Sequence, residues 1–522
     1  MIKPYSFVYI FFFSLFIQPA LSQPKYEFRG VWVATVDNID WPSNKYLNSD
    51  SQKTEFIRLL DMHKKNGMNA VIVQIRPATD AFYPSQYEPW SEWLTGTQGK
   101  PPTPYYDPLD FMIAETHKCG MEFHAWMNPY RAQFNINTSS ISPIHITRLH
   151  PEWFLNYGDK KYFDPGNKEV QIFVNNIVKD VVSRYEVDAI HFDDYFYPYR
   201  IQGKEFPDDS SYLKYGNGLS KDDWRRSNVD SIITMLGKTI KQENKYCKFG
   251  ISPFGVWRNS DKNAEGSNTK AGQTNYDDLY ADILLWLKMK WIDYAAPQLY
   301  WEFGQRVVPF ETLIDWWARH SYGRHLYIGH GVYRAFEAKS PAWKNKNELP
   351  NQIKKLREYP QVQGSIYFSS KTFEKNPNGW NDSLQNNYYH YPALIPAMPW
   401  ISNNKPKWPL VAYDSAIANS FTDSIKISVR QDSLSAEVNK YVLYSFFDSS
   451  QILIGDPKNI VTIISSQQGS FVYPLINIPG DQTKIVIAAT CVTKSGIESD
   501  VSRYIYLEKK ENKWVVTGLV NK

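Results

Sequence analysis

Short apolar runs alternate with amphipathic stretches over most of the chain, from about residue 29 to residue 370. The runs are a few residues long and rich in Val, Ile, Phe and Tyr, as in GVWVATV and NAVIVQI. Strands that are buried on both faces of a parallel sheet have this composition. The runs predict eight strands, at residues 29–36, 69–77, 122–128, 188–194, 248–256, 293–301, 326–332 and 364–369.

The stretches between these runs carry the signals of helices. Before the fourth strand, Val170, Val174 and Ile177 form an apolar stripe at helical spacing. Before the fifth strand, Ser220 and Asp223 resemble a capping box that begins a helix. Eight strand–helix units in this order predict an α/β fold, a (β/α)8 TIM-type barrel over residues 26–400. An open doubly wound sheet is the alternative, but no glycine-rich phosphate loop follows the first strand.

The pattern changes after a polar, proline-containing linker at residues 401–409. Beyond it, short alternating runs at 425–430, 441–447, 459–465 and 484–493 predict strands, and no helical stripe appears. Residues 410–522 are therefore predicted to form a small all-β sandwich. Its segment IVIAATCVTKSGIESDVS resembles the last hairpin of fibronectin type III modules, so we expect a fibronectin type III-like domain.

The first 22 residues have the features of a secretory signal peptide. Lys3 precedes an apolar run at residues 5–17, which is too short to span a bilayer. Ala20 and Ser22 are small residues of the kind found before a cleavage site, which we expect after Ser22. The mature protein is predicted to be periplasmic or extracellular, with no transmembrane segment. An uncleaved N-terminal anchor is the alternative.

Composition excludes several classes of partner. The net charge is only +4 and no run of Lys or Arg is present, which does not favour nucleic-acid binding. Three cysteines, far apart in sequence, predict neither a disulfide framework nor a thiolate metal site. Aromatic residues make up 16% of the chain, which suits stacking on sugar rings but also suits a large core. We expect a monomer without a cofactor.

The candidate chemistry lies where the predicted strands end, because barrels of this kind place their active sites there. Glycosidic hydrolysis usually needs two carboxyl groups that flank the bond. The candidates are Asp193, Asp194 and Glu302. Side chains alternate along a strand, so the two adjacent aspartates do not easily flank one sugar, and pairing one of them with Glu302 is easier. Alternatively, the aspartates cap the next segment or bind Arg76 or Arg131.

Polar and aromatic residues near the other strand ends are candidates for sugar binding. The long aromatic loop at residues 80–107 is predicted to form a wall of the cleft or a lid on the barrel rim. No spacing among the histidines favours a metal site, so none is predicted. The predicted substrate-binding residues are Arg76, His124, Trp126, Asn128, His191, Trp257, Gln298, Tyr300, Trp301 and His330.

Seven motifs carry a family resemblance. They are FRGVWVATVDNIDWP, QIRPATDAFYPS, EPWSEWLTGTQG, HAWMNPYRA, HFDDYFYP, ISPFGVWRN and PQLYWEFG. Together they resemble the glycosyl-hydrolase-like family 10 proteins, the YngK-type group, over about residues 26–392. The resemblance implies a TIM-type barrel, a secreted or envelope location, and cleavage of peptidoglycan glycan strands stripped of their peptides. The family's strand-four motif falls on Asp193 and Asp194.

Three functional hypotheses follow. The first is a glycoside hydrolase that cleaves a polysaccharide, foremost peptide-free cell-wall glycan, by carboxylate acid/base catalysis. The second is a glycan-binding barrel that lacks a working pair of carboxyls. The third is a metal-dependent deacetylase of amino sugars.

Overall fold

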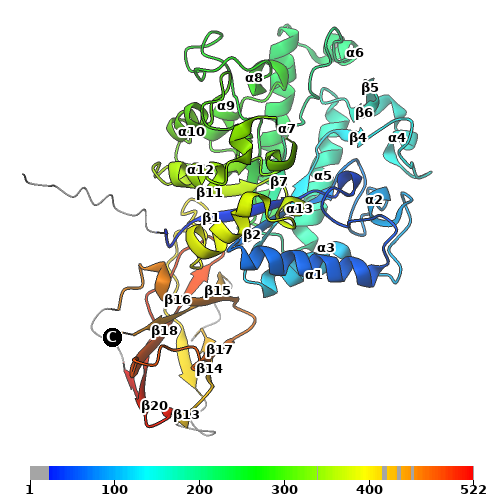
Figure 1. The fold of residues 1–522 in the computed structure, drawn as a ribbon. Coiled ribbons are helices and arrows are strands. Elements are labelled where there is room, and N and C mark those ends of the chain that lie inside the picture. The colour runs from blue at the N-terminus through cyan, green and yellow to red at the C-terminus, as the bar shows by residue number, and fades with distance from the viewer. Residues whose placement is uncertain (1–22, 338, 414–419, 432–436, 448–451, 521–522) are drawn as a thin grey trace, which may run out of the picture.

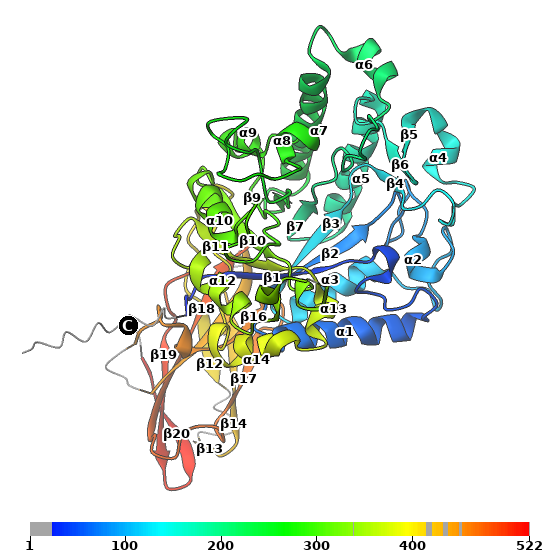
Figure 2. The same cartoon turned by 45° about the horizontal axis from the view of Figure 1, so that its top comes forward.

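The computed structural model describes residues 23–337, 339–413, 420–431, 437–447 and 452–520. The predicted signal peptide lies outside the described residues. Two parts are visible in Figures 1 and 2: a large barrel wrapped in helices and a smaller region of antiparallel strands beside it. None of the described helices is long and apolar enough to cross a membrane.

Eight parallel strands close into a barrel, in the spatial order β1-β11-β10-β9-β8-β7-β3-β2. Each of the eight predicted strands overlaps one of them, so the predicted barrel is confirmed. The bounds are shorter than predicted at most strand ends, because chain that has left the sheet continues the apolar run. The strands are β1 (Phe28–Val33), β2 (Ala70–Arg76), β3 (Glu122–Met127), β7 (Ala189–Phe192), β8 (Lys248–Ile251), β9 (Tyr294–Ala295), β10 (His325–His330) and β11 (Val362–Tyr367).

Helices cover the outside of the barrel, and their ends follow the predicted signals. The Asp223 backbone N–H donates to the side chain of Ser220, which caps the helix that follows. A small antiparallel sheet after β3 was not predicted; it comprises β4 (Arg131–Gln133), β5 (Phe154–Tyr157) and β6 (Lys160–Phe163). The main helices are α1 (Ser49–Lys65), α3 (Pro108–Lys118), α5 (Lys168–Arg184), α7 (Lys221–Glu243), α9 (Ile283–Lys288), α10 (Phe310–Arg319) and α12 (Glu348–Leu356).

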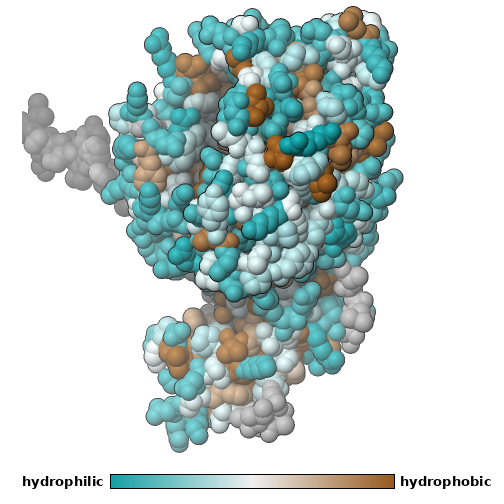
Figure 3. Space-filling view, turned by 90° about the vertical axis from the view of Figure 1, so that its right-hand side faces the viewer, coloured by the Kyte–Doolittle hydropathy of each residue, from teal (hydrophilic) through white to brown (hydrophobic). Residues whose placement is uncertain are grey.

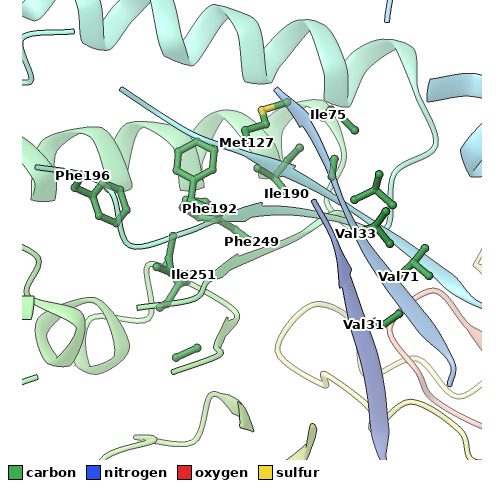
Figure 4. Close-up of a cluster of buried hydrophobic side chains, with 14 of the residues drawn as sticks. Val31, Val33, Val71, Ile75, Met127, Ile190, Phe192, Phe196, Phe249 and Ile251 are labelled. Carbon is green, nitrogen blue, oxygen red and sulfur yellow. The ribbon is translucent and has the colours of Figure 1, made fainter. Parts of the chain in front are cut away.

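The strands are buried on both faces, as their composition predicted. Outward side chains such as Val31, Ile190 and Phe249 pack in the layer between the strands and the helices (Figure 4). Inward side chains such as Phe28 and Ile72 fill the barrel. A side chain's position in the alternation therefore decides whether it faces the helices or the barrel axis.

Beyond the barrel, two antiparallel sheets share a second apolar core. The three-stranded sheet has the order β12-β14-β17, and the six-stranded sheet the order β13-β20-β19-β18-β15-β16. The predicted strands match β14, β15, β16 and β18; the others were missed because their alternation is short or interrupted by charges. The likeness to fibronectin type III modules stays a prediction. The strands are β12 (Leu410–Tyr413), β13 (Ser420–Phe421), β14 (Ser424–Arg430), β15 (Val438–Phe446), β16 (Ile460–Ser465), β17 (Ser470–Pro474), β18 (Lys484–Thr493), β19 (Tyr504–Lys510) and β20 (Lys513–Val520).

This β-region packs under the N-terminal ends of the barrel strands. The Tyr246 hydroxyl, just before β8, donates to Glu437 Oε1 at 2.6 Å. Lys25 Nζ, just before β1, lies 2.7 Å from Glu498 Oε2. Figure 3 shows the two parts as lobes of unequal size. The β-region therefore occupies the end of the barrel opposite to the strand exits, where the predicted chemistry lies.

A buried ion pair lies in the barrel at the N-terminal ends of the strands. Glu122 of β3 accepts a hydrogen bond from Lys248 Nζ of β8 and lies 3.0 Å, Oε2 to Nε2, from His124. Burial acts to raise the pKa of Glu122, but the Lys248 ammonium and the His124 hydrogen bond outweigh it, so the pKa lies below its usual value. The pair therefore stabilises the fold above the unfolded-state pKa of 4.5, and this stabilisation is lost at lower pH.

We expect Lys248→Met to reduce the free energy of unfolding at pH 7 by about 3 kcal/mol, because it removes the ammonium group that contacts the buried Glu122 carboxylate. The difference from wild type should shrink as the pH falls below 4.5 towards the lowered pKa of folded Glu122, because a protonated carboxyl no longer needs the cation. Urea unfolding at both pH values measures this. Lys245→Met, at an exposed lysine, is the matched control. Equal stability of the Lys248 variant and wild type at pH 7 would contradict the assignment.

Candidate active site

A cleft of about 440 Å³ opens at the C-terminal ends of the barrel strands. Every barrel strand, or the segment that follows it, contributes to its lining. Taken in chain order, one lining residue from each is Trp32, Gln74, Trp126, Asp193, Ser252, Gln298, Tyr333 and Phe368. Aromatic rings form much of the wall, together with two carboxyl groups and two guanidinium groups.

Asp193 and Asp194 both line this cleft because strand β7 ends just before them, at Phe192. In a continued strand, Asp194 would point to the opposite face from Asp193. The backbone instead bends at Asp194, and both side chains are almost fully buried. The chain thus brings two neighbouring carboxyl groups to one wall of the cleft.

Asp193 is held by donors from β3 and its exit. Asn128 Nδ2 donates to Asp193 Oδ2, and Trp126 Nε1 lies 3.3 Å from the same oxygen. Asn128 is fixed in turn by Gln74, whose Nε2 donates to its Oδ1 at 2.5 Å. Burial and the neighbouring Asp194 charge raise the pKa of Asp193 to about 7, against a smaller lowering by Arg131. This carboxyl therefore titrates near neutral pH.

Asp194 has its own donors on the other side. The Tyr199 hydroxyl donates to Asp194 Oδ2 at 2.5 Å. Burial raises the pKa of Asp194 to about 6, although the hydrogen bonds from Tyr199 and Gln298 act to lower it. Two adjacent carboxyls with raised pKa values titrate as a coupled pair, which holds one proton over part of the range between pH 6 and 7.

A column of polar side chains runs down the barrel axis beneath the pair. Trp32 Nε1 lies 3.2 Å from His191 Nε2, and an indole N–H can only donate, so this histidine nitrogen accepts. His191 Nδ1 then donates to the Tyr294 hydroxyl at 3.0 Å, and this hydroxyl donates to His124 Nδ1 at 2.9 Å. His124 Nε2 donates in turn to Glu122. Burial lowers the pKa of both histidines, so both are neutral at pH 7.

The structure therefore separates the predicted substrate-binding residues into three groups. Trp126, Gln298, Tyr300 and Trp301 line the cleft. Asn128 stands behind Asp193 as its hydrogen-bond donor. The remaining predicted residues, Arg76, His124, His191, Trp257 and His330, are not part of the cleft lining.

Each of these remaining residues has a partner elsewhere. His124 and His191 belong to the axial column. Arg76 forms a two-pronged pair with Glu88, with Nη2 2.6 Å from Oε1, and anchors the long loop to the barrel. Trp257 donates to Asp282 Oδ1 at 3.2 Å, outside the barrel wall. His330 Nδ1 lies 2.8 Å from Gln352 Oε1 on α12, so it faces the helix layer.

Glu302 is not brought to the cleft with the two aspartates. Its Oε2 accepts a hydrogen bond from Trp343 Nε1 at 2.9 Å, and it is absent from the cleft lining. Strand β9 ends at Ala295, so the chain has already left the barrel wall when it reaches this residue. None of the lining residues falls in the loop at residues 80–107, so this loop is not part of the cleft wall, and its alternative role as a lid on the barrel rim stays a prediction.

Several lining residues were not among the predicted substrate-binding residues. Tyr199 comes from the segment after β7, and Arg131 from the unpredicted strand β4. Phe254, Tyr333 and Phe368 follow strands β8, β10 and β11. For most of these residues, the sequence signal that could have identified them was their position just after a strand. Within the described ranges, no group of three or more His, Cys, Asp or Glu side chains is placed to hold a metal ion.

Comparison with known proteins identifies the family. The sequence profile described as "Glycosyl hydrolase-like 10" matches residues 27–345. This range contains both aspartates and seven of the eight barrel strands; β11 and the lining residue Phe368 lie beyond it. The chain belongs to this family. Glycosyl hydrolase YngK of Bacillus subtilis strain 168 is 50% identical over 395 residues, covering 75% of this chain and 77% of YngK. Glycosyl hydrolase DigH of Escherichia coli K12 is 38% identical over 382 residues, covering 68% of this chain and 86% of DigH.

Two solved structures are similar to this chain at low sequence identity. The PgaB (BpsB) glycoside hydrolase domain of Bordetella bronchiseptica is 13% identical with a TM-score of 0.44, covering 69% of this chain and 98% of that domain. The catalytic domain of a β-amylase from Paenibacillus polymyxa is 10% identical with a TM-score of 0.46, covering 71% of this chain and 99% of that domain. The profile match and the two relatives YngK and DigH confirm the family predicted from the motifs.

Asp193→Asn is expected to stabilise the protein at pH 8. Since burial raises the pKa of Asp193 to about 7, stability present at low pH is lost as the pH rises through 7 and the buried carboxyl ionises. An amide carries no charge there, so we expect the Tm at pH 8 to rise by roughly 2–5 °C, with a smaller change at pH 5. Calorimetry at both pH values measures this, with exposed Asp261→Asn as control. A Tm at pH 8 no higher than that of wild type would show that Asp193 is not strained by ionisation.

Proposed function

We propose that this protein is an exported glycoside hydrolase that cleaves peptide-free peptidoglycan glycan strands. The observation that carries the proposal is the buried Asp193–Asp194 pair, which lines an aromatic cleft at the catalytic end of the barrel. Membership of a glycosyl hydrolase-like family supports the reaction class. The substrate is the one implied by the motif resemblance, and the aromatic walls suit a chain of pyranose rings.

One carboxyl of the pair would act as general acid. A carboxyl with a pKa near 6 or 7 is a competent proton donor at neutral pH, where an ordinary aspartate is ionised. Its proton would go to the glycosidic oxygen as the bond from that oxygen to C1 breaks. The other carboxyl, ionised, would stabilise the positive charge that develops on the sugar.

The attacking group is proposed to come from the substrate. The cleft carboxylates among the described residues are Asp193 and Asp194, both on one wall, whereas a protein nucleophile or a water-activating base must stand across the bond. Each amino sugar of the strand carries an acetamido group whose oxygen can attack C1 of the same ring. The resulting oxazolinium would then be opened by water, which returns a proton to the acid. We therefore propose Asp193 and Asp194, and not Glu302, as the catalytic carboxyls.

Glycan binding without cleavage is the second candidate. The aromatic lining, including Trp126, Tyr300 and Trp301, would hold a sugar chain whether or not a bond is broken. The raised pKa values of both aspartates favour the hydrolase, because a pure binding site gains nothing from carboxyls that are costly to ionise.

We expect Asp193→Asn and Asp194→Asn each to lower kcat on peptide-free glycan by about 10²–10⁴-fold, since each removes a proton-transfer or charge-stabilising group. Glu302→Gln, which removes a carboxylate outside the cleft lining, should change kcat by less than about threefold. Release of reducing ends measures turnover, and Tm values establish folding. Wild-type rates in both aspartate variants, or an equal loss in Glu302→Gln, would overturn this assignment.

Removal of the acetyl groups from the substrate should abolish most turnover. We expect N-deacetylated strands to be cleaved at least about 100-fold more slowly, because the intramolecular nucleophile is lost. Chemical re-acetylation of the same sample should restore the rate and serves as its control. NMR of the first product should reveal retained anomeric configuration. Inversion, or equal cleavage of both substrates, would refute participation of the acetamido group.

A further inference from the structure

The cleft contains a buried guanidinium group that forms no ion pair with any of the described residues. Arg131 is only 7% exposed and lines the cleft. Its contacts are with rings: the guanidinium carbon lies 4.8 Å from the Tyr195 ring centroid and 5.8 Å from that of Phe134. Its Nε has no hydrogen-bond partner. Throughout the described ranges, no carboxylate lies within ion-pair distance of Arg131.

The other buried arginines are neutralised. Arg29, Arg76 and Arg225 are buried to a similar or greater degree, and each has a carboxylate within 2.8 Å. A buried charge is costly unless it is paired, and proteins normally pair it. Arg131 departs from this rule in the lining of the cleft.

The aspartates do not satisfy this group. The charge of Arg131 acts to lower the pKa of Asp193 and of Asp194, but burial dominates both. No hydrogen bond joins Arg131 to either carboxyl, and within the described ranges its guanidinium forms no side-chain hydrogen bond. A guanidinium of this kind matches a carboxylate with two parallel N–H···O bonds.

We infer that Arg131 binds a carboxylate carried by the sugar substrate, and so selects anionic strands over neutral ones. This role of Arg131 rests on the proposed function, for which Arg131 would determine substrate specificity. In intact peptidoglycan the lactyl carboxyl of each muramyl unit is tied up in an amide bond to the peptide. Removal of the peptide frees the anion, so an unpaired buried arginine favours stripped strands. Arg334, which lines the same cleft, has no ion pair in the described part of the chain and would meet a second anionic group.

The test combines a variant with a chemically altered substrate. Peptide-free glycan is compared with the same glycan after reduction of its carboxyls to alcohols. Wild type should lose about 10–100-fold in kcat/KM on the reduced glycan. Arg131→Gln should show a similar loss on native glycan but little further loss on reduced glycan. Arg148→Gln, at an exposed arginine, should behave as wild type on both.

Arg131→Lys covers the case in which the glutamine variant does not fold, since it keeps the charge but not the two-pronged geometry. It should lose part of the native-glycan activity and none on reduced glycan. Equal loss on both glycans would mean that Arg131 acts through the aspartates or the fold. No loss on native glycan would mean that it binds no anion. Either result overturns the inference.

Binding separates this inference from the hydrolase proposal. Calorimetric titration of Asp194→Asn with native and carboxyl-reduced oligosaccharides needs no turnover. Tighter binding of the native form that is lost with Arg131→Gln supports the inference even if wild type cleaves neither glycan. Equal binding of the two forms overturns it even if wild type is an active hydrolase.

Discussion

Two neighbouring carboxyl groups held out of water at the end of β7 are the constraint on which the site depends. Burial makes their joint ionisation unfavourable, and the neighbouring hydrogen-bond donors and the Arg131 charge reduce that cost. Asn128 and Trp126 donate to Asp193, and Tyr199 donates to Asp194. The donors keep both groups in place while burial keeps a proton available near neutral pH. A less buried pair would be ionised and unable to protonate a leaving group.

The barrel supplies the rigidity that this arrangement needs. The axial column from Glu122 through His124, Tyr294 and His191 gives each inner polar atom a partner, which a closed parallel barrel must provide where water is absent. Its upper end, at Trp32 and Ser252, forms the floor of the cleft. The antiparallel β-region closes the opposite end. The floor and the carboxyl pair therefore lie on strands or directly after their ends, whereas the rim is built from loops.

The strands and the aspartate pair could be predicted because apolar runs and strand exits are local signals. How deep a side chain lies along the barrel axis is not encoded by such local signals. His191 was predicted to bind substrate because it lies near the end of its strand, yet it lies within the column, two residues before Asp193. The His330 side chain points out of the barrel towards the helix layer, where it contacts Gln352 of α12. Arg131 and Tyr199 reach the cleft from segments after strands, whose path no periodicity specifies. Glu302 lies too far beyond the end of β9 for strand geometry to place it.

The state of the carboxyl pair can be observed directly by ¹³C NMR of protein labelled at aspartate carboxyl carbons, with Asp193→Asn and Asp194→Asn used for assignment. The pair should titrate with apparent pKa values near 6 and 7. Titration of both carboxyls below pH 5, as for exposed aspartates, would contradict the account.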